Sequence, residues 1–203
     1  TCPPSTDRSS ASSVRADRSS WCPLPKSRSA PTLPPLDHLA VLSDDVGIIQ
    51  HAVKNVPNRE TGYCTDDISR AFMVALAHGR LAPSDRVSQR PASNYLAFLH
   101  HAQLEDGRFH NFMSYDRRWL DEIGTHDSCG RAVWALGYGV ANAPNETWRS
   151  VCGRMLDRAI LSLDKLEYVR SRAYAALGLA HALSVRQDER HAQALRYLTA
   201  EIA

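Results

Sequence analysis

Three aspartates stand where the sequence predicts that helices begin, and their type and spacing suit chemistry on a glycosidic bond. Asp66 and Asp67 are adjacent in GYCTDDISRA (62–71), and Asp127 opens DSCGRA (127–132). Cleavage of a glycosidic bond uses two carboxyl groups roughly 5 to 9.5 Å apart, one as acid and the other as base or nucleophile. Neighbouring helical residues diverge by about 100°. The predicted catalytic pair is therefore Asp127 with Asp66 or Asp67, rather than the two adjacent residues.

Each of these aspartates also has a purely structural interpretation, which the sequence leaves open. Aspartate is a common N-cap residue, and a cap stabilises a helix by about 1 kcal/mol. Arg70 follows Asp66 by four residues, and Arg131 follows Asp127 by four, a spacing at which opposite charges pair within one helix. We expect that one of Asp66 and Asp67 caps its helix and pairs with Arg70, while the other works with Asp127 on a sugar.

The segment DGRFHNFMSYDRRWLDEIGTHDS (106–128) carries a second group of candidate residues. It has no helical period, and a loop of this length inside a compact domain is usually functional. Its aromatic rings suit stacking on sugars, and its charged groups suit binding to hydroxyls; the alternative is that the rings fill the core. Together with two residues near the first helix start, the predicted substrate-binding residues are Tyr63, Arg70, Asn111, Tyr115, Asp116, Arg117, Arg118, Trp119 and His126.

Other chemistries have weaker support in the sequence. His126, Asp127 and Asp66 offer three metal ligands, but no dense spacing such as HExxH accompanies them, so neither a metal nor another cofactor is expected. Cys64 and Cys129 flank the aspartates, and a nucleophilic thiol there would need a nearby histidine as its base. The sequence contains no P-loop, no GxGxxG and no GxSxG motif.

From residue 36 onward the hydrophobic pattern is that of helices. In NETWRSVCGRMLDRAILSL (145–163) apolar residues recur every three or four positions, and Asn145 is a suitable N-cap. ERHAQALRYLTAEI (189–202) has the same spacing. Both segments are therefore predicted to be amphipathic helices that bury one face.

A further helix is predicted over NYLAFLHHAQL (94–104), with Asn94 or Ser93 as its cap. Alternation with a period of two, which is typical of strands, is nearly absent from the sequence. VGIIQHAV (46–53) is a weak strand candidate. Strands are thus expected to contribute little to the fold.

A weak internal repeat links three predicted helices. DDISRAFMVALAHG (66–79), DSCGRAVWALGYGV (127–140) and YVRSRAYAALGLAHAL (168–183) share an Arg-Ala pair and many small residues. They alternate with bulkier amphipathic helices, which suggests stacked hairpins with crowded inner helices. The predicted fold is all-α, an α/α toroid or part of one, with an irregular helical bundle as the alternative. In a toroid the inner helices run parallel, so the three aspartates would share one mouth.

The helical domain is predicted to cover residues 36–203 and to follow an N-terminal segment of different composition. Residues 1–35 hold nine Ser and seven of the eleven Pro but no Gly, with five basic and two acidic residues. Such a segment buries little apolar surface, so a disordered leader is expected. The non-Met start suggests a processed or fragment end. Because about three hairpins precede residue 203, we expect either a fragment or a partial ring that a partner or a second copy completes.

Bulk properties argue against several function classes. The formal net charge of +2 gives no argument for a nucleic-acid or membrane partner. No apolar run approaches the ~20 residues that span a bilayer, and no secretory signal is recognisable. The five cysteines are scattered without a CxxC pair, which favours free thiols in a reducing compartment. A cytoplasmic location is therefore expected.

The motifs GYCTDD, DGRFHNFMSYDRRW and DSCGRA, within about residues 36–183, resemble those of a group of bacterial helical proteins. Members of that group occur alone or attached to glycosyltransferase modules, and near mannoside-processing enzymes. They are often described as glycosyltransferase- or glycosidase-related. More loosely, the helical pattern is similar to the six-hairpin toroids of many glycosidases. The resemblance implies work on carbohydrates but identifies no catalytic residue, and the Ser/Pro-rich leader departs from the group.

Two functions follow as expectations. In the first, the chain is an enzyme that hydrolyses or transfers glycosidic bonds, with carboxylates at helix starts as acid and base. In the second, it is a non-catalytic module that binds a glycan or docks on a glycosyltransferase, which requires the aromatic segment but not the carboxylates. A helical scaffold without a sugar role is the third and least favoured interpretation. The expected partner is a carbohydrate, with no nucleic acid and no membrane.

Overall fold

Helices dominate the computed structural model, which describes residues 33–83 and 89–202. Two 3₁₀ segments, Arg59–Thr61 and Ile160–Lys165, and four two-residue strands add the remaining regular structure of the described residues. The all-α class predicted from the sequence is confirmed. The α-helices are α1 (Asp37–Val41), α2 (Thr65–Leu81), α3 (Gln89–Ala102), α4 (His126–Asn142), α5 (Glu146–Ala159), α6 (Val169–Leu183) and α7 (Glu189–Ala200).

The compact unit begins at Leu33. The leader expected over residues 1–35 therefore lies, apart from its last three residues, outside the described residues. Residues 33–35 carry no regular structure and are exposed.

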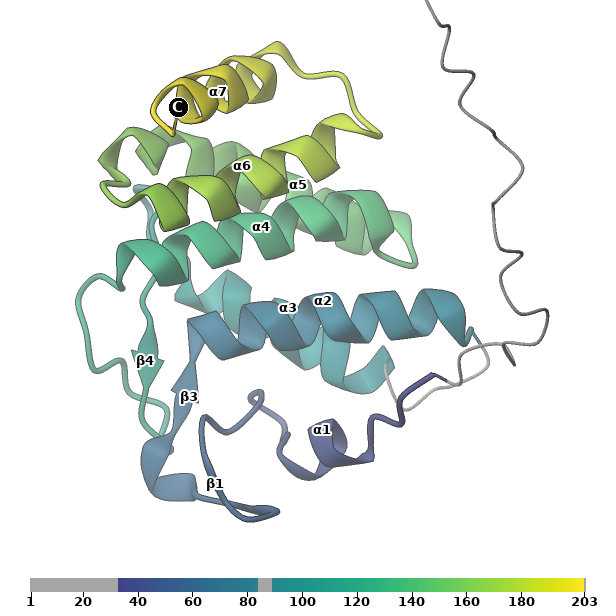
Figure 1. Cartoon of the computed structure of the whole chain (residues 1–203). Helices are drawn as coiled ribbons and strands as arrows, with labels where there is room; N and C mark the ends of the chain where they lie inside the picture. Colours follow the sequence, from purple (N-terminus) through teal and green to yellow (C-terminus); the bar gives the residue numbers. More distant parts are fainter. Residues whose placement is uncertain (1–32, 84–88, 203) are drawn as a thin grey trace, which may run out of the picture. The chain divides into compact units, whose positions relative to one another are not determined.

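Six of the helices form three consecutive hairpins, α2–α3, α4–α5 and α6–α7. In Figure 1, α2, α4 and α6 lie side by side, α3 and α5 run behind the first two, and α7 lies over α6. The helix α4 is central, because it packs against α2, α5 and α6. The first helix of each hairpin thus belongs to one layer, which we call the inner layer, and this layer contains the three predicted repeats.

Small residues let the backbones of α4 and α6 come into contact. A Cβ added at Gly137 would overlap the carbonyl oxygen of Gly178, and one added at Gly178 would overlap that of Val133. Near the start of both helices, Gly130 lies against the carbonyl of Ser171 in the same way. The Ala/Gly-rich repeats of α4 and α6 therefore pack closely, as the sequence predicts.

The helix caps agree with the sequence prediction at one position and differ at others. Asn145 caps α5, since its Oδ1 accepts the N–H of Trp148 at 2.9 Å, as predicted. The predicted cap on the third helix is wrong, because α3 is already helical at Gln89. Asn94 lies within α3 and donates instead to the carbonyl of Asp44 at 3.0 Å.

The predicted aspartate caps are also corrected. The residue before α2 is Cys64, which makes no side-chain cap bond, so Asp66 and Asp67 lie inside the first turn of the helix. At α4 the cap is Thr125, whose hydroxyl accepts the N–H of Ser128 at 3.2 Å. Aspartates in a first turn still interact favourably with the helix dipole.

Strands play a small part, as expected. β1 (Ala52–Val53) pairs with β2 (Val56–Pro57), and β3 (Tyr63–Cys64) pairs antiparallel with β4 (Phe112–Met113). The weak strand candidate at 46–53 therefore forms a strand only at its end, with isolated bridges at Ile48 and Ile49. The pairing of β3 with β4 ties the long loop before α4 to the start of α2.

The core lies between the two helix layers. Fully buried side chains come from both, including Ile68 and Phe72 of α2, Leu99 of α3, and Leu136 of α4. Among the helices of the described chain, none combines the length and the apolar character that crossing a membrane requires.

Candidate functional site

The N-terminal ends of α2, α4 and α6 lie on one side of the molecule, next to β3 and β4 (Figure 1). Asp66 and Asp67 occupy the first turn of α2, and Asp127 occupies the first turn of α4. Parallel helices with neighbouring N-termini concentrate partial positive charge, which stabilises these carboxylates. The tertiary structure therefore brings all three aspartates to one end of the inner layer.

Arginines hold both carboxylates of α2. Arg70 lies 2.7 Å from Asp66 Oδ2 and 2.6 Å from Asp67 Oδ1. The predicted i, i+4 pair of Asp66 with Arg70 is confirmed. Asp66 also pairs through Oδ1 with Nε of Arg131, which reaches across from α4. Asp66 is thus shared by two guanidinium groups from two helices.

The pairing of Asp127 differs from the prediction of an intrahelical ion pair. Among the described residues its partner is Arg170 of α6. Arg131, the expected partner, turns instead toward Asp66 and donates to the hydroxyl of Tyr174 at 2.9 Å. We call this group the inner-helix cluster; its members are Asp66, Asp67, Arg70, Asp127, Arg131, Arg170 and Tyr174.

Asp67 is the carboxyl of this cluster that is biased toward its protonated form. Burial raises its pKa above the ordinary value, and the negative charge of Asp66 adds to the rise. The positive charges of Arg70, His51 and Arg131 oppose the rise without cancelling it. A carboxyl with a raised pKa is suited to donate a proton.

Aromatic rings adjoin the cluster on α4 and α6. The Arg131 guanidinium lies over the ring of Tyr174, with 4.3 Å from Cζ to the ring centroid. Tyr174 in turn stacks on Trp134, with centroids 5.7 Å apart and ring planes at 13°. The sequence reasoning missed Arg170, Tyr174 and Trp134 as site residues. The sequence contains a signal for two of them, because Arg170 and Tyr174 lie one helical turn apart at the start of the third repeat.

The long loop of residues 103–125 packs against the start of α2. The hydroxyl of Thr65 donates to the carbonyl of His110 at 2.6 Å, and the Thr65 N–H donates to that of Asn111 at 2.8 Å. Within the loop, Asp121 accepts the N–H groups of Asn111 and Phe112 at 3.0 to 3.1 Å. These bonds fix the loop beside the inner-helix cluster.

The aromatic residues of this loop divide between core and surface. Phe109 is fully buried, whereas Phe112 and Tyr115 are exposed. Trp119 is half-buried and stacks on His110, with centroids 4.6 Å apart and ring planes at 14°. It also meets Phe98 of α3 edge to face at 5.5 Å. Trp119 therefore supports the loop, Phe109 fills the core as the alternative interpretation had it, and only Phe112 and Tyr115 are exposed enough for the predicted stacking on sugars.

The tip of the loop carries the charged residues predicted to bind substrate. Asp116, Arg117 and Arg118 are all exposed, and Arg118 lies 2.5 Å from Asp116. Arg117 has a positive φ of 65° and reaches Asp45 at 2.6 Å. Beside them, the exposed Tyr115 accepts a hydrogen bond of 3.0 Å from Arg59 Nε.

Two other predicted contact residues are buried. Tyr63 is 1% exposed, and its hydroxyl donates to Asp44 at 2.6 Å. Burial, followed by this hydrogen bond, raises the pKa of Tyr63. Asn111 is 4% exposed, and its Oδ1 accepts the thiol of Cys64 at 3.2 Å. Both side chains hold the β3–β4 region together rather than facing solvent.

His126 opens α4 and lines a pocket of about 230 Å³, whose wall also includes Phe109, Cys129 and Leu166. Its Nδ1 accepts the N–H of Glu167 at 3.1 Å. Among the residues that line this pocket there is no member of the inner-helix cluster.

The cysteines near the aspartates are poor nucleophiles. Burial raises the pKa of the Cys64 thiol to about 11 and also raises that of Cys129. A thiol with such a pKa is almost entirely protonated at neutral pH. The raised thiol pKa values therefore argue against a cysteine nucleophile at this site.

Comparisons with known proteins give no assignment. No family model matches this chain, and no curated protein matches it.

Among the described residues, a compact group of metal-ligand types occurs away from the inner-helix cluster. It consists of Asp157, Asp188 and His191, which join α5 to α7. The weak metal alternative considered from the sequence, His126 with Asp127 and Asp66, is not such a group in the described residues. This second cluster is therefore independent of the predicted site.

Proposed function

We propose that the chain is a carbohydrate-active domain that acts on glycosidic bonds at the end of its inner helix layer. The observation that carries the proposal is the convergence of Asp66, Asp67 and Asp127 at neighbouring helix N-termini. Arginines and two stacked aromatic rings adjoin them. Carboxylates and guanidinium groups bind hydroxyls, and aromatic rings stack on sugar faces.

In this proposal Asp67 is the general acid and Asp127 is the base or nucleophile. Burial raises the pKa of Asp67, and a raised pKa is the direction of shift that a general acid needs. Asp127 is held by Arg170, whose guanidinium is 69% exposed and free to rotate away when a sugar enters. Asp66 is a positioning residue, because it holds Arg70 and Arg131 in place.

The second candidate is a non-catalytic module that binds a glycan or docks on a glycosyltransferase. Its support is that each of the three carboxylates already has an arginine partner. Ion-paired carboxylates can accept hydrogen bonds from hydroxyls but are poorly placed for proton transfer. The exposed loop tip of Tyr115 and Arg118 offers a further polar surface for such binding.

For the fold, we propose that the three hairpins are part of an α/α toroid, completed by a glycosyltransferase module or by a second copy of the chain. The parallel, close-packed inner layer supports this arrangement. Buried free thiols at Cys64, Cys129 and Cys152 are consistent with a reducing compartment, so we further propose that the protein is cytoplasmic.

A glycan panel that starts with mannosides and is scored for release of reducing sugar tests the proposal. We expect Asp67→Asn and Asp127→Asn to lose more than a hundredfold in turnover, while Asp164→Asn, an exposed aspartate, keeps full activity. Full activity in both cluster variants would reject the catalytic assignment.

Binding titrations with the same glycans separate the two candidates. Binding without turnover on any glycan, retained in Asp127→Asn and lost in Tyr115→Ala or Trp119→Ala, would support the binding module. Circular dichroism of each variant excludes loss of the fold as the cause. The absence of both turnover and binding across the whole panel would reject a carbohydrate role.

A further inference from the structure

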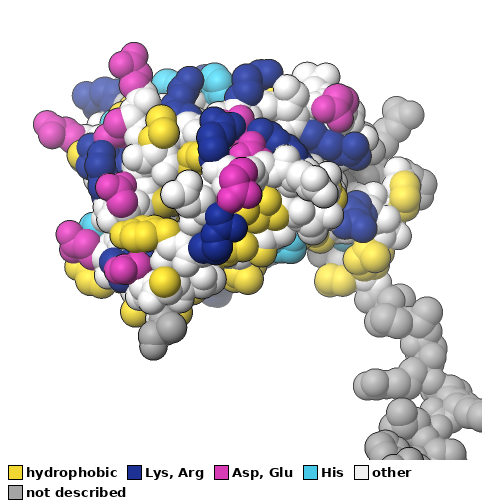
Figure 2. Space-filling view, turned by 90° about the horizontal axis from the view of Figure 1, so that it is seen from above, with side chains coloured by type: hydrophobic (Ala, Val, Ile, Leu, Met, Phe, Trp, Pro, Cys, Tyr) yellow, Lys and Arg dark blue, Asp and Glu magenta, His cyan; other side chains and the backbone are white. Residues whose placement is uncertain are grey.

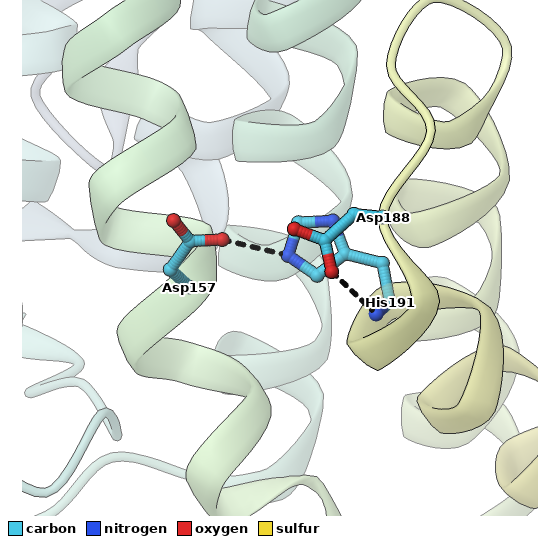
Figure 3. A group of neighbouring side chains, drawn as sticks. All are labelled: Asp157, Asp188 and His191. Carbon is cyan, nitrogen blue, oxygen red and sulfur yellow. Dashed lines mark hydrogen bonds and ion pairs between the residues drawn. The ribbon is translucent and has the colours of Figure 1, made fainter.

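Asp157, Asp188 and His191 bring three potential ligand atoms together between α5 and α7 (Figure 3). One atom from each side chain lies within 4.8 Å of the others. Ligands about 2.1 Å from a metal ion are about 3 Å apart when they occupy adjacent octahedral positions. The separation of His191 Nε2 and Asp157 Oδ1 is 2.9 Å. This spacing fits two ligands of one ion, and it is also the spacing of an ion pair between the two side chains.

The imidazole of His191 is buried without an aligned hydrogen bond. The side chain is 1% exposed, and neither ring nitrogen has a partner of acceptable geometry among the described residues. Nε2 points toward the carboxylate of Asp157, but the contact is out of line for a hydrogen bond (Figure 3). A buried polar group normally finds a partner, since an unmade bond costs about 1 to 3 kcal/mol. A metal ion would accept the nitrogen lone pair.

The carboxylate of Asp188 is fixed in position, and both of its oxygens have partners in the structure. Its Oδ1 accepts the N–H groups of Arg190 and His191, at 3.0 and 3.3 Å, and so caps α7. Its Oδ2 contacts guanidinium groups, at 2.8 Å from Arg186 and 3.3 Å from Arg190. Metal-binding carboxylates are commonly held by such additional hydrogen bonds.

Arg186 and Arg190 also contact Asp157, so the group has an alternative interpretation as a salt-bridge network. Both arginines are partly exposed, at 39% and 63%, and can turn into solvent when a cation replaces them. The face that carries α7 has basic and acidic side chains interspersed (Figure 2). Within the salt-bridge network His191 Nε2 lies 2.9 Å from Asp157 Oδ1 but makes no aligned hydrogen bond, whereas an ion would accept its lone pair.

The group is reached from solvent at Asp157, whereas Asp188 and His191 do not line the adjoining pocket. Asp157 and Arg186 line a pocket of about 480 Å³, together with Arg149, Ser150 and Arg154. An ion can enter through this pocket, and water can fill coordination positions that the protein does not supply.

We propose that Asp157, Asp188 and His191 bind a divalent transition-metal ion, of the Zn²⁺ or Mn²⁺ type, that links α5 to α7. One imidazole nitrogen with two carboxylates is a donor set for such ions, whereas Ca²⁺ and Mg²⁺ prefer oxygen alone. Because the ligands come from the second and third hairpins, the ion stabilises the docking of α7.

Isothermal titration of the full chain with zinc chloride tests the proposal. We expect one saturable site in the wild type and in Asp164→Asn, the matched aspartate control. Asp157→Asn is expected to weaken binding at least tenfold. Arg190→Gln removes a guanidinium group that competes with the ion, so this variant is expected to bind zinc more tightly than the wild type does. Zinc should also raise the thermal midpoint of the wild type but not that of Asp157→Asn.

Several outcomes would overturn the proposal. These are the absence of a saturable site, equal affinity in Asp157→Asn, and unchanged or weaker binding in Arg190→Gln. Because the chain has free cysteines, Co²⁺ spectra are recorded as well; strong thiolate charge-transfer bands would assign the ion to cysteine and reject this site. If Asp157→Asn fails to fold, the Arg190→Gln result decides.

Discussion

Arg131 of α4 pairs with Asp66 of α2, although Asp127 lies one turn before it in its own helix. Among the described residues, Asp127 pairs instead with Arg170 of α6. In both cases an arginine of one repeat neutralises an aspartate of the preceding repeat, although Arg170 is not the arginine of the shared Arg-Ala pair. The ion pairs tie the three inner helices together at their N-terminal ends, where the proposed carbohydrate site lies.

Replacement of Asp66 by asparagine should destabilise the fold more than the same change at Asp127. Both side chains are 24% exposed, but Asp66 holds Arg131, which is 18% exposed, whereas Asp127 holds Arg170, which is 69% exposed. An arginine that is partly buried and loses its carboxylate lowers the free energy of unfolding by about 1 to 2 kcal/mol. For an exposed arginine the decrease is about 0.5 kcal/mol. Urea denaturation measures both. Equal losses would contradict the cross-helix assignment.

Asp67→Asn should stabilise the protein at neutral pH. Because burial raises the pKa of Asp67 in the folded state, the folded chain binds this proton more tightly than the unfolded chain. Stability is therefore greatest below the ordinary pKa of 3.8 and falls as the pH rises through the raised pKa. Asparagine removes the charge and hence the penalty.

The pH dependence of unfolding provides the check. The free energy of unfolding of Asp67→Asn should exceed that of the wild type at pH 7. The two should converge at about pH 3, where Asp67 is protonated in both states. A wild type that is more stable than the variant at pH 7 would show that the ion pair with Arg70 outweighs burial.

Gly137→Ala should be strongly destabilising, because the new Cβ would overlap the carbonyl oxygen of Gly178. Separation of two packed helix backbones costs about 1 to 3 kcal/mol or more. Gly153→Ala is the matched control in α5, since its Cβ would meet only the end of the Arg186 side chain at 3.2 Å. There the helix propensity of alanine favours stability by up to about 1 kcal/mol. Thermal unfolding of both variants tests the contrast.

Asn145→Ala should remove the cap of α5 and reduce stability by about 1 kcal/mol. Asn145→Asp should retain it, because a carboxylate oxygen accepts the same N–H and favours the helix N-terminus. Chemical denaturation of the two variants provides the test. A similar loss in both would mean that the side chain of Asn145 contributes through something other than capping.

Much of the local structure could be predicted because it depends on neighbouring residues. The apolar spacing of residues 145–163, the cap at Asn145 and the small residues of the repeats predicted helices and their close packing correctly. The cap of the third helix was predicted wrongly, because Asn94 satisfies its side chain by a contact with Asp44, 50 residues away. Tertiary contacts of that kind leave no periodic signal in the sequence.

The sequence by itself determined the all-α class, the positions of most helices and the presence of Asp66, Asp67 and Asp127 near helix starts. Only the tertiary structure decided the ion partners of these carboxylates. The arginine that each carboxylate meets depends on how α2, α4 and α6 are shifted along their axes relative to one another. Backbone contacts, such as that of Gly137 with Gly178, set this register. The group of Asp157, Asp188 and His191 was likewise invisible beforehand, because its ligands come from two helices that only packing brings together.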